Sequence, residues 1–272
     1  MREVVVGYRR SVSSVVVAAL VSSVVGCADD TFDGAYGADV DAPDRVSAAT
    51  DAAIVALTVN GQQFCTGTLI EPDVVLTAAH CLPPHVPLER FEDIEVFFGD
   101  DVEGDGAFVG VRHGWTHPDW SEDGFRFDIG LLRLVQPATV APIPLREVPM
   151  GHEMVGAPVR ISGFGISESG ADDGGTKREA TTEVTAVYQG VFEMGVATAN
   201  TCQGDSGGPA LIVDEGVEQV AGVHSRSDCE TSSIDTSVAD HRLEIEAFLR
   251  VGCDRDGYCA DDCAEPDPDC RS

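Results

Sequence analysis

The sequence predicts an all-β protein that ends in one helix. Between residues 53 and 238, short apolar runs alternate with Gly, Pro, Asn and Asp, which is typical of strands joined by turns. Strands this short and closely spaced favour an antiparallel barrel or sandwich over βαβ units. One helical pattern, over residues 240–250, follows the last run and is stopped by Gly252.

Each expected strand is an apolar run bounded by turn residues. The polar, Gly-rich stretch 167–179 between two of these runs predicts an exposed loop. The expected helix carries an apolar set of Leu, Ile, Ala and Phe side chains. We expect strands at residues 53–59, 64–70, 73–78, 94–98, 129–135, 158–163, 209–213 and 219–223.

Charge and composition exclude several classes of protein. The chain has 272 residues, a net charge of −30 and 43% hydrophobic residues, so it can bury a core and is not a disordered polyelectrolyte. Lys177 is its one lysine, which excludes the basic clusters that nucleic-acid binding needs. No apolar run reaches the roughly 20 residues that span a bilayer, which excludes a polytopic membrane protein. Nine cysteines indicate an oxidising compartment.

The first 26 residues have the pattern of an export signal. A start with three arginines is followed by the short apolar stretch 11–25, which predicts a signal peptide over residues 1–26. The next residue, Cys27, follows Val-Val-Gly, which resembles the bacterial lipobox. We favour a lipidated Cys27 over ordinary cleavage because its use as an anchor leaves eight cysteines that can all pair. This predicts an exported protein, held at the outer membrane or cell surface by that anchor or otherwise secreted.

Composition divides the remainder of the chain into three segments. Residues 27–48 are small and acidic, which predicts a flexible tether. Residues 49–252 hold the expected strands and helix. Residues 253–272 are too few to bury a core, so we expect two disulfides with three pairings open, and no zinc site because paired CxxC spacing is absent. The cysteines of this tail are Cys253, Cys259, Cys263 and Cys270.

The strongest chemical signal is CQGDSGGP at residues 202–209. Glycines around Ser206 let the backbone turn sharply, so that the hydroxyl is exposed and N–H groups face whatever it attacks. The same residues satisfy the GxSxG elbow of α/β-hydrolases. That alternative is disfavoured, because it requires a parallel sheet before the serine, whereas residues 53–200 predict antiparallel strands. It also requires an acid and then a histidine after the serine, and only 66 residues follow Ser206.

A nucleophilic serine needs a base, and a neutral imidazole is the usual one near pH 7. Among seven histidines, His80 stands out because it follows an apolar strand in LTAAHC. Asp128 begins the apolar run DIGLLRL, where burial of a carboxylate is costly unless it is hydrogen-bonded, for instance to an imidazole. These three residues therefore form the candidate catalytic set.

TAAHC, DIGLLRL and CQGDSGGP, in that order, resemble the signature blocks of the chymotrypsin/trypsin family of serine peptidases. The resemblance covers about residues 50–251 and includes FCTGTLI, a His-Pro pair at His117, and the C-terminal helix. It implies two six-stranded antiparallel β-barrels with the active site in the cleft between them. It also implies a serine endopeptidase that acts on polypeptides.

The family resemblance implies a role for each matching residue. His80 would act as general base and then acid, Asp128 would orient it, and Ser206 would be acylated. The N–H groups of Gly204 and Ser206 would form the oxyanion hole. The same match implies two disulfides, Cys65–Cys81 and Cys202–Cys229, and a structural role for His117.

The start of the domain departs from the family pattern. Family members begin with a hydrophobic residue and Val-Gly-Gly, whose freed amino group pairs with the aspartate before the serine, here Asp205. The corresponding start lies near Val40, and no such motif occurs there. We therefore expect either a cut within residues 36–50 that frees an atypical terminus, or a side chain such as Arg45 in the place of the amine.

Four residues are candidates for the pocket that selects the substrate side chain. Asn200 stands where trypsin-like members carry the aspartate that binds Lys or Arg, so cleavage after those residues should be poor. Thr201, His224 and Ser227 resemble the pocket of bacterial glutamyl endopeptidases. A polar pocket for neutral side chains, with His224 packed or solvated, is the favoured alternative.

Two other functions remain open, a catalytically silent binding module and a surface-anchored adhesion protein. The complete catalytic set disfavours the first, and the acidic tail is the reason to keep the second. No cofactor is expected, since the acidic stretch of residues 100–105 fits a turn better than a structural calcium site. We expect a monomer with no catalytic metal, no nucleic-acid partner and no membrane contact apart from the anchor.

Overall fold

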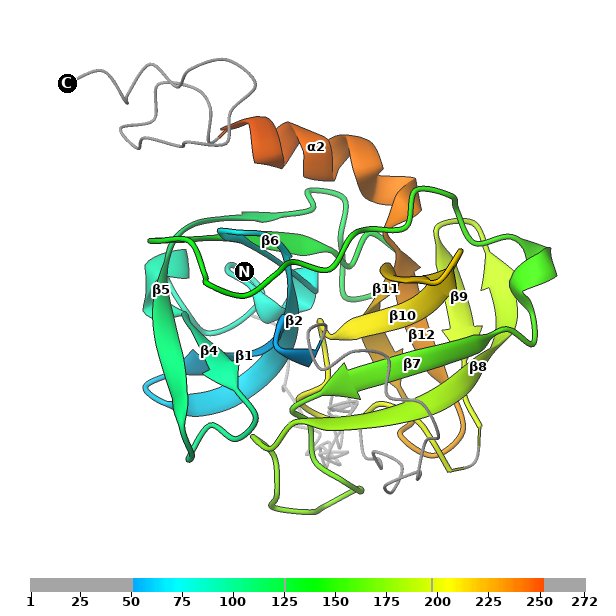
Figure 1. The fold of residues 1–272 in the computed structure, drawn as a ribbon, viewed down its shortest axis with the longest axis horizontal. Coiled ribbons are helices and arrows are strands. Elements are labelled where there is room, and N and C mark those ends of the chain that lie inside the picture. The colour runs from blue at the N-terminus through cyan, green and yellow to red at the C-terminus, as the bar shows by residue number, and fades with distance from the viewer. Residues whose placement is uncertain (1–50, 125, 197, 252–272) are drawn as a thin grey trace, which may run out of the picture. The chain divides into compact units, whose positions relative to one another are not determined.

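The computed structural model describes residues 51–124, 126–196 and 198–251, which form two closed six-stranded antiparallel barrels (Figure 1). This confirms the expected fold class. The predicted signal peptide, the anchor at Cys27, the tether, the sites within residues 36–50 and the cysteine-rich tail all lie outside the described residues.

The first barrel has the strand order β1-β2-β3-β6-β5-β4 and closes through the pairing of β1 with β4. Asn60 and Gly61 join β1 to β2 with positive φ angles of 53° and 77°, the geometry that Asn-Gly favours in a two-residue hairpin. The strands are β1 (Ile54–Val59), β2 (Gln62–Glu71), β3 (Val74–Thr77), β4 (Glu95–Gly99), β5 (Gly106–Thr116) and β6 (Gly130–Leu134).

The second barrel has the order β10-β11-β12-β9-β8-β7 and closes through β10 and β7. Its β10–β11 hairpin turns at Glu215 and Gly216, again with two positive φ angles. The strands are β7 (Pro158–Gly163), β8 (Arg178–Tyr188), β9 (Val191–Met194), β10 (Pro209–Asp214), β11 (Val217–Ser227) and β12 (Ser233–Ser237).

Four strands, β5, β8, β9 and β12, were not among the apolar runs that the sequence singled out. In β8 the side chains from Ala180 to Glu183 alternate between buried and exposed, so only every second residue needs to be apolar. In β12 the residues Asp235, Thr236 and Ser237 are buried although they are polar. Hydrophobicity alone therefore underestimates strands that bury polar residues or expose every second side chain.

The C-terminal helix α2 (Arg242–Val251) follows the last strand of the second barrel and packs on the first. Ile245 and Phe248 belong to the buried core. Arg133 of β6 donates hydrogen bonds to the Phe248 and Leu249 carbonyls, at 3.1 Å each, and to the Asp73 carboxylate at 3.0 Å. A buried guanidinium thus satisfies carbonyls at the end of the helix, where cations are favoured.

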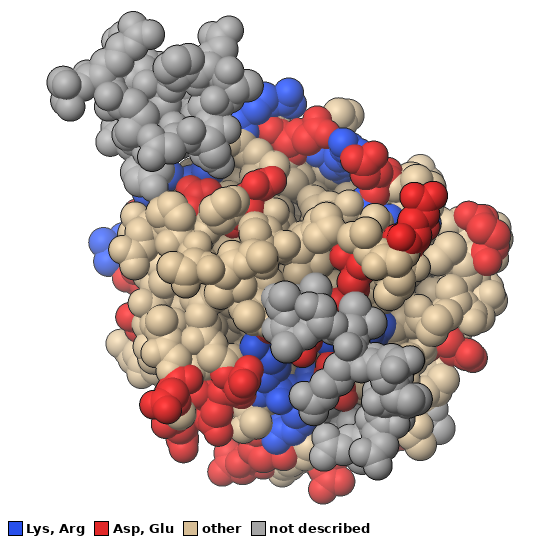
Figure 2. All heavy atoms as spheres, viewed as in Figure 1, with Lys and Arg blue, Asp and Glu red and all other residues tan. Residues whose placement is uncertain are grey.

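Several basic side chains of the described segments are paired with acidic ones. Arg160 contacts the carboxylates of Asp51, Glu179 and Glu218 at 2.7–2.8 Å. Lys177 lies 3.3 Å from Asp100. Figure 2 shows acidic atoms across the visible face, with the basic atoms beside them. No helix within the described residues is long and apolar enough to cross a membrane.

Replacement of Arg133 by Met should destabilise the fold by about 2–4 kcal/mol, because Asp73 and two helix-end carbonyls lose a buried donor. Chemical denaturation should show the loss as a lower midpoint with an unchanged slope. Arg250→Met is the control, since this exposed side chain makes one ion pair of 3.9 Å on the same helix. Equal stabilities of the two variants would contradict the anchoring role of Arg133.

Candidate active site

Ser206 lies in the turn that leads into β10. Gly204 and Gly207 on either side have φ angles of +96° and +83°. A Cβ at Gly207 would lie 2.1 Å from the Thr77 hydroxyl oxygen, so the turn requires glycine there. The Ser206 carbonyl accepts a 2.8 Å hydrogen bond from the Thr66 N–H of β2, which ties the turn to the first barrel.

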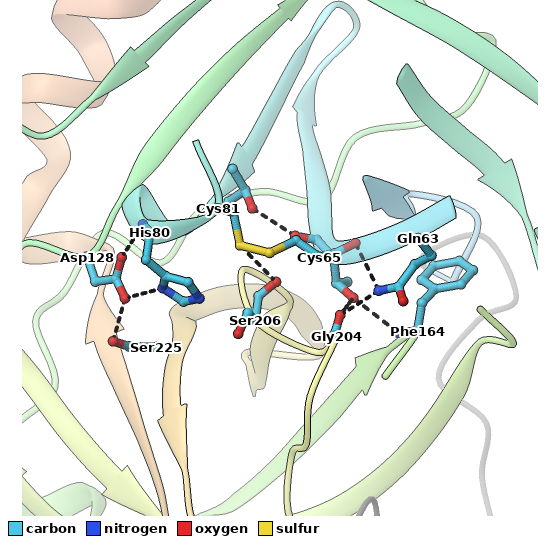
Figure 3. Close-up of a disulfide and its surroundings, with 11 residues drawn as sticks. Gln63, Cys65, His80, Cys81, Asp128, Phe164, Gly204, Ser206 and Ser225 are labelled. Atoms are coloured by element: carbon cyan, nitrogen blue, oxygen red, sulfur yellow. Dashed lines mark hydrogen bonds and ion pairs between the residues drawn. A yellow bond between two sulfur atoms is a disulfide. The ribbon is translucent and has the colours of Figure 1, made fainter. Parts of the chain in front are cut away.

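His80 lies in a short 3₁₀ helix, Ala79–Cys81, directly after β3. The expected disulfide between Cys65 of β2 and Cys81 is confirmed and fastens this helix to the barrel wall (Figure 3). The His80 side chain remains 28% exposed although it pairs with Asp128, so part of the imidazole ring is open to solvent.

Asp128 is buried before β6 and faces His80. Its Oδ1 accepts the His80 backbone N–H at 2.9 Å, and its Oδ2 lies 2.7 Å from His80 Nδ1. Oδ2 also accepts the Ser225 hydroxyl at 2.6 Å. Burial by itself would raise the pKa of Asp128, but the charge and hydrogen bonds of His80, with the bond from Ser225, outweigh it and hold the pKa below its ordinary value. Asp128 is therefore ionised at neutral pH.

The structure brings the three predicted catalytic residues together. Figure 3 shows the Ser206 side chain on the side of the His80 ring opposite Asp128. Because the Asp128 carboxylate only accepts hydrogen bonds, His80 Nδ1 carries its proton, and in the neutral ring Nε2 keeps a lone pair. A serine beside such an imidazole can lose its proton as it attacks a carbonyl.

The backbone before Asp128 is held by a buried aromatic cluster. Phe127 has a φ angle of +67°, a strained conformation for a bulky residue. Its ring stacks on His117 with centroids 4.8 Å apart, and His241 contacts both rings from the start of the C-terminal helix. The expected structural role of His117 thus includes support for the residue adjacent to Asp128.

Ser225 was missed by sequence reasoning, although it binds Asp128 directly. It sits in β11 between two residues that were singled out, His224 and Ser227, and a serine in a strand carries no signal of its own. Its contact with Asp128 spans 97 positions of sequence. Only closure of the second barrel against the first brings this hydroxyl to the carboxylate.

The four predicted pocket residues lie on neighbouring segments of the second barrel. Asn200 is buried and its amide donates to the Val196 and Glu230 carbonyls at 2.7 and 2.8 Å. The Thr201 hydroxyl pairs with that of Ser233 at 2.9 Å. The Ser227 hydroxyl donates to the Thr201 carbonyl at 2.6 Å. The amide donors of Asn200 and both hydroxyls are therefore used within the protein.

His224 is buried and pairs with a residue that sequence reasoning did not single out. Its Nδ1 lies 2.8 Å from Oδ2 of Asp235, a fully buried residue of the adjacent strand β12. Among the described residues, no hydrogen-bond partner reaches His224 Nε2. Asp235 fixes the proton on Nδ1, so Nε2 keeps its lone pair, and Asp235 Oδ1 is likewise without a partner within the described residues.

The second disulfide implied by the family resemblance is not formed in the structure. Cys202 and Cys229 are buried thiols. The side-chain hydrogen bond with Cys202, together with burial, raises the pKa of the Cys229 thiol.

Asp205 is fully buried directly before Ser206. Its two carboxylate oxygens accept the Gly165 and Cys202 N–H groups at 2.8 Å each. Burial raises its pKa to about 6, against these backbone hydrogen bonds. No ion pair to Asp205 occurs within residues 51–124, 126–196 and 198–251. The cation expected from the region of Arg45 or from a new terminus lies outside the described residues.

Among the described residues, two side-chain groups have the composition of a metal site. The first contains Cys65 and Cys81, whose sulfurs are already bonded to each other. The second contains His117, His241 and Glu244, but His117 Nδ1 accepts the Asp119 N–H at 3.1 Å. Its Nε2 therefore carries the proton and is not a ready metal ligand.

The acidic stretch of residues 100–105 makes the contacts of a turn. Asp101 Oδ1 accepts the Glu103 N–H at 2.9 Å, and the carboxylate of Asp100 pairs with Lys177. Both contacts occupy oxygens that a calcium ion would use. They are in keeping with the acidic turn favoured from the sequence.

Two closed antiparallel barrels that hold a serine, an imidazole and a buried carboxylate in line define the class of two-barrel serine peptidases. The trypsin family model matches residues 44–241. The chain is 33% identical over 177 residues to a trypsin of Saccharopolyspora erythraea, across 58% of this chain and 75% of that protein. It is 32% identical over 166 residues to a trypsin of Squalus acanthias, across 56% and 70%.

A longer protein matches over part of its length, and a solved structure shares the fold. Coagulation factor XII of Sus scrofa is 31% identical over 189 residues, and the match covers 30% of its length. The solved structure of mouse neuropsin, a serine protease expressed in the limbic system, superposes with a TM-score of 0.62 at 23% identity, over 74% of this chain and 96% of that one. The chain belongs to the trypsin family and is a serine-type endopeptidase.

The buried histidines next to Phe127 should make the fold sensitive to acid. Burial lowers the pKa of His117, and burial with the neighbouring His117 lowers that of His241, from 6.5. The unfolded chain therefore binds protons first, and stability should fall as the pH drops below 6.5. His241→Gln should lose less unfolding free energy between pH 7 and pH 5 than the wild type.

Thermal unfolding across this pH range measures the effect. His152→Gln is the control, because His152 is exposed. Asp205, whose pKa is raised, acts in the opposite direction, but it is common to all three proteins and cancels in the comparison. The same pH dependence in wild type and His241→Gln would show that the cluster does not couple to protonation.

Proposed function

We propose that the protein hydrolyses peptide bonds through an acyl-enzyme on Ser206. The observation that carries the proposal is the position of His80, bonded to Asp128 through Nδ1 at 2.7 Å and turned toward Ser206 on its other side. The residues come from both barrels, and their contacts support the roles that the family resemblance implies.

In the first half of the reaction, Ser206 Oγ attacks the scissile carbonyl carbon while His80 Nε2 takes the hydroxyl proton. The N–H groups of Gly204 and Ser206 bind the negative oxygen of the tetrahedral intermediate. His80 then gives the proton to the leaving amine as the C–N bond breaks. Ionised Asp128 stabilises the imidazolium in between.

In the second half, water takes the place of the amine. His80 accepts a proton from the water as it attacks the acyl carbon, and returns that proton to Ser206 Oγ as the ester bond breaks. The same two N–H groups bind the second oxyanion. The enzyme ends in its starting protonation state, and the products are a carboxylate and an amine.

The proposal extends to the substrate side chain before the cleaved bond. Asn200 offers a neutral amide oxygen in place of a carboxylate, and this atom has no hydrogen-bond partner within the described residues. An amide oxygen does not balance a buried cation, so Lys and Arg are poor substrates. Because the Thr201 and Ser227 hydroxyls bind protein atoms, uncharged side chains are favoured over Glu. Glutamate remains the alternative if His224 binds it as an imidazolium.

Export completes the proposed function. We propose that residues 1–26 direct the chain out of the cytoplasm and that Cys27 carries a lipid, with residues 27–48 as the tether. Support for this comes from the order of charged, apolar and small residues at the N-terminus. A peptidase held this way would act on polypeptides outside the cytoplasm.

Ser206→Ala should lower kcat by a factor on the order of 10⁴ or more while the fold survives, because only the nucleophile is removed. A fluorophosphonate probe should label wild type and leave the variant unlabelled. Ser167→Ala, in a loop outside the site, is the control. Equal labelling of wild type and Ser206→Ala would disprove the assignment. An unlabelled wild type would favour the silent binding module or the adhesion protein.

A peptide library should show cleavage after Arg or Lys at least about 10²-fold slower, in kcat/KM, than after the preferred residue. His224→Ala tests the alternative. If Glu is preferred, its cleavage should collapse in His224→Ala and should weaken at higher pH in wild type, since the imidazolium loses its charge. A preference for Leu, Phe or Ala would exclude the glutamyl alternative, and a preference for Arg would contradict the argument from Asn200.

A further inference from the structure

Thr66 of β2 binds both peptide carbonyls that follow the two proposed oxyanion-hole N–H groups. Its backbone N–H donates to the Ser206 carbonyl, and its hydroxyl donates to the Gly204 carbonyl, each at 2.8 Å. Gln63 Nε2 donates a second hydrogen bond of 2.8 Å to the Gly204 carbonyl. Figure 3 shows Gln63 and Gly204 side by side at the edge of the first barrel. Two side chains of one strand thus hold the turn of the other barrel.

The Thr66 hydroxyl has one orientation that satisfies all of its neighbours. It accepts the Phe164 N–H at 3.1 Å through a lone pair, so its single proton is left for the Gly204 carbonyl. The Thr66 carbonyl in turn accepts the Thr77 hydroxyl at 2.8 Å. Thr66 is fully buried, and water cannot replace these bonds. Its hydroxyl is a fixed donor.

The hydrogen bonds fix the peptide planes on both sides of Gly204. The Gln203 carbonyl before it accepts the Ile166 N–H at 2.9 Å. Because a trans peptide is planar, the Gly204 N–H points away from that carbonyl. The peptide after Gly204 is held by Thr66 and Gln63. With both planes held, the φ and ψ angles of Gly204 cannot change without the loss of these bonds.

These hydrogen bonds matter because the carboxylate of Asp205, the next residue, has no ion-pair partner in the described part of the chain. Asp205 follows Gly204 and is held by two backbone N–H groups, with no ion pair among the described residues. Hydrogen bonds from the first barrel therefore contribute to the order of the turn, together with those from the second barrel. We propose that Thr66 is a positioning residue of the oxyanion hole. Its hydroxyl, assisted by Gln63, holds the Gly204 N–H toward the reacting oxygen. This inference rests on the proposed function.

A second buried threonine of β2 provides a comparison for Thr66. Thr68 is also buried in β2, two residues on, but its hydroxyl has no hydrogen-bond partner within the described residues. Replacement by Val keeps the shape of either residue and removes one hydroxyl. Thr68→Val is therefore a matched control for Thr66→Val, with the same chemistry, strand and degree of burial.

The test compares catalysis with oxyanion binding. Thr66→Val should lower kcat about 10–100-fold with KM within threefold of wild type, less than the 10²–10³-fold that follows direct loss of an oxyanion donor. Its affinity for a peptide aldehyde, which forms a hemiacetal on Ser206, should fall by the same factor, while its affinity for the product peptide is unchanged. Thr66→Ser should keep kcat within about threefold, because it keeps the hydroxyl.

Thr68→Val should behave as wild type in both assays. If Thr66→Val matches Thr68→Val in kcat and aldehyde affinity, or if its loss lies in KM alone, the proposal is wrong. Should Thr66→Val fail to fold, Gln63→Met removes the second donor and should lower kcat and aldehyde affinity together, or the proposal fails. A wild type that the fluorophosphonate does not label would overturn the proposed function itself. Labelling of wild type and Thr66→Val at equal rates would overturn this inference alone.

Discussion

The burial of Asp128 is the constraint on which the rest of the site depends. An ionised carboxylate taken out of water is costly unless its oxygens are hydrogen-bonded. Two of its donors belong to His80, on the first barrel, and the third is Ser225, on the second. The carboxylate is satisfied only when the barrels are closed against each other, so the same contacts that assemble the site also stabilise the domain.

The same principle applies where the two barrels meet around Ser206. The serine turn offers carbonyls that would be unsatisfied in a barrel folded alone, and β2 provides the donors through Thr66 and Gln63. The C-terminal helix adds a third link. It leaves the second barrel, packs on the first, and has its terminal carbonyls bound by Arg133. Polar groups, and not apolar area alone, determine how these parts fit together.

Two buried aspartates near Ser206 have pKa values shifted in opposite directions by their surroundings. The charge interaction and hydrogen bonds with His80, together with the bond from Ser225, hold the pKa of Asp128 down against its burial. Asp205 receives only two backbone N–H groups, and burial raises its pKa to about 6. The first is suited to balance an imidazolium during the reaction. The second is suited to accept a cation that reaches it, which is how family members with a freed amino group use this position.

The sequence by itself predicted an all-β fold, most strand positions and the candidate set of His80, Asp128 and Ser206, and its resemblance to a family implied the two barrels. These depend on local patterns, namely apolar runs between turns and glycines around a serine. The tertiary structure alone showed that Ser225 binds Asp128 and that Asp235 binds His224. It alone showed that Thr66 binds the Gly204 and Ser206 carbonyls. The bonds of Ser225 and Thr66 join residues 97 and 138 positions apart. No local pattern encodes such partners, because barrel closure and strand register choose which buried donor meets which acceptor.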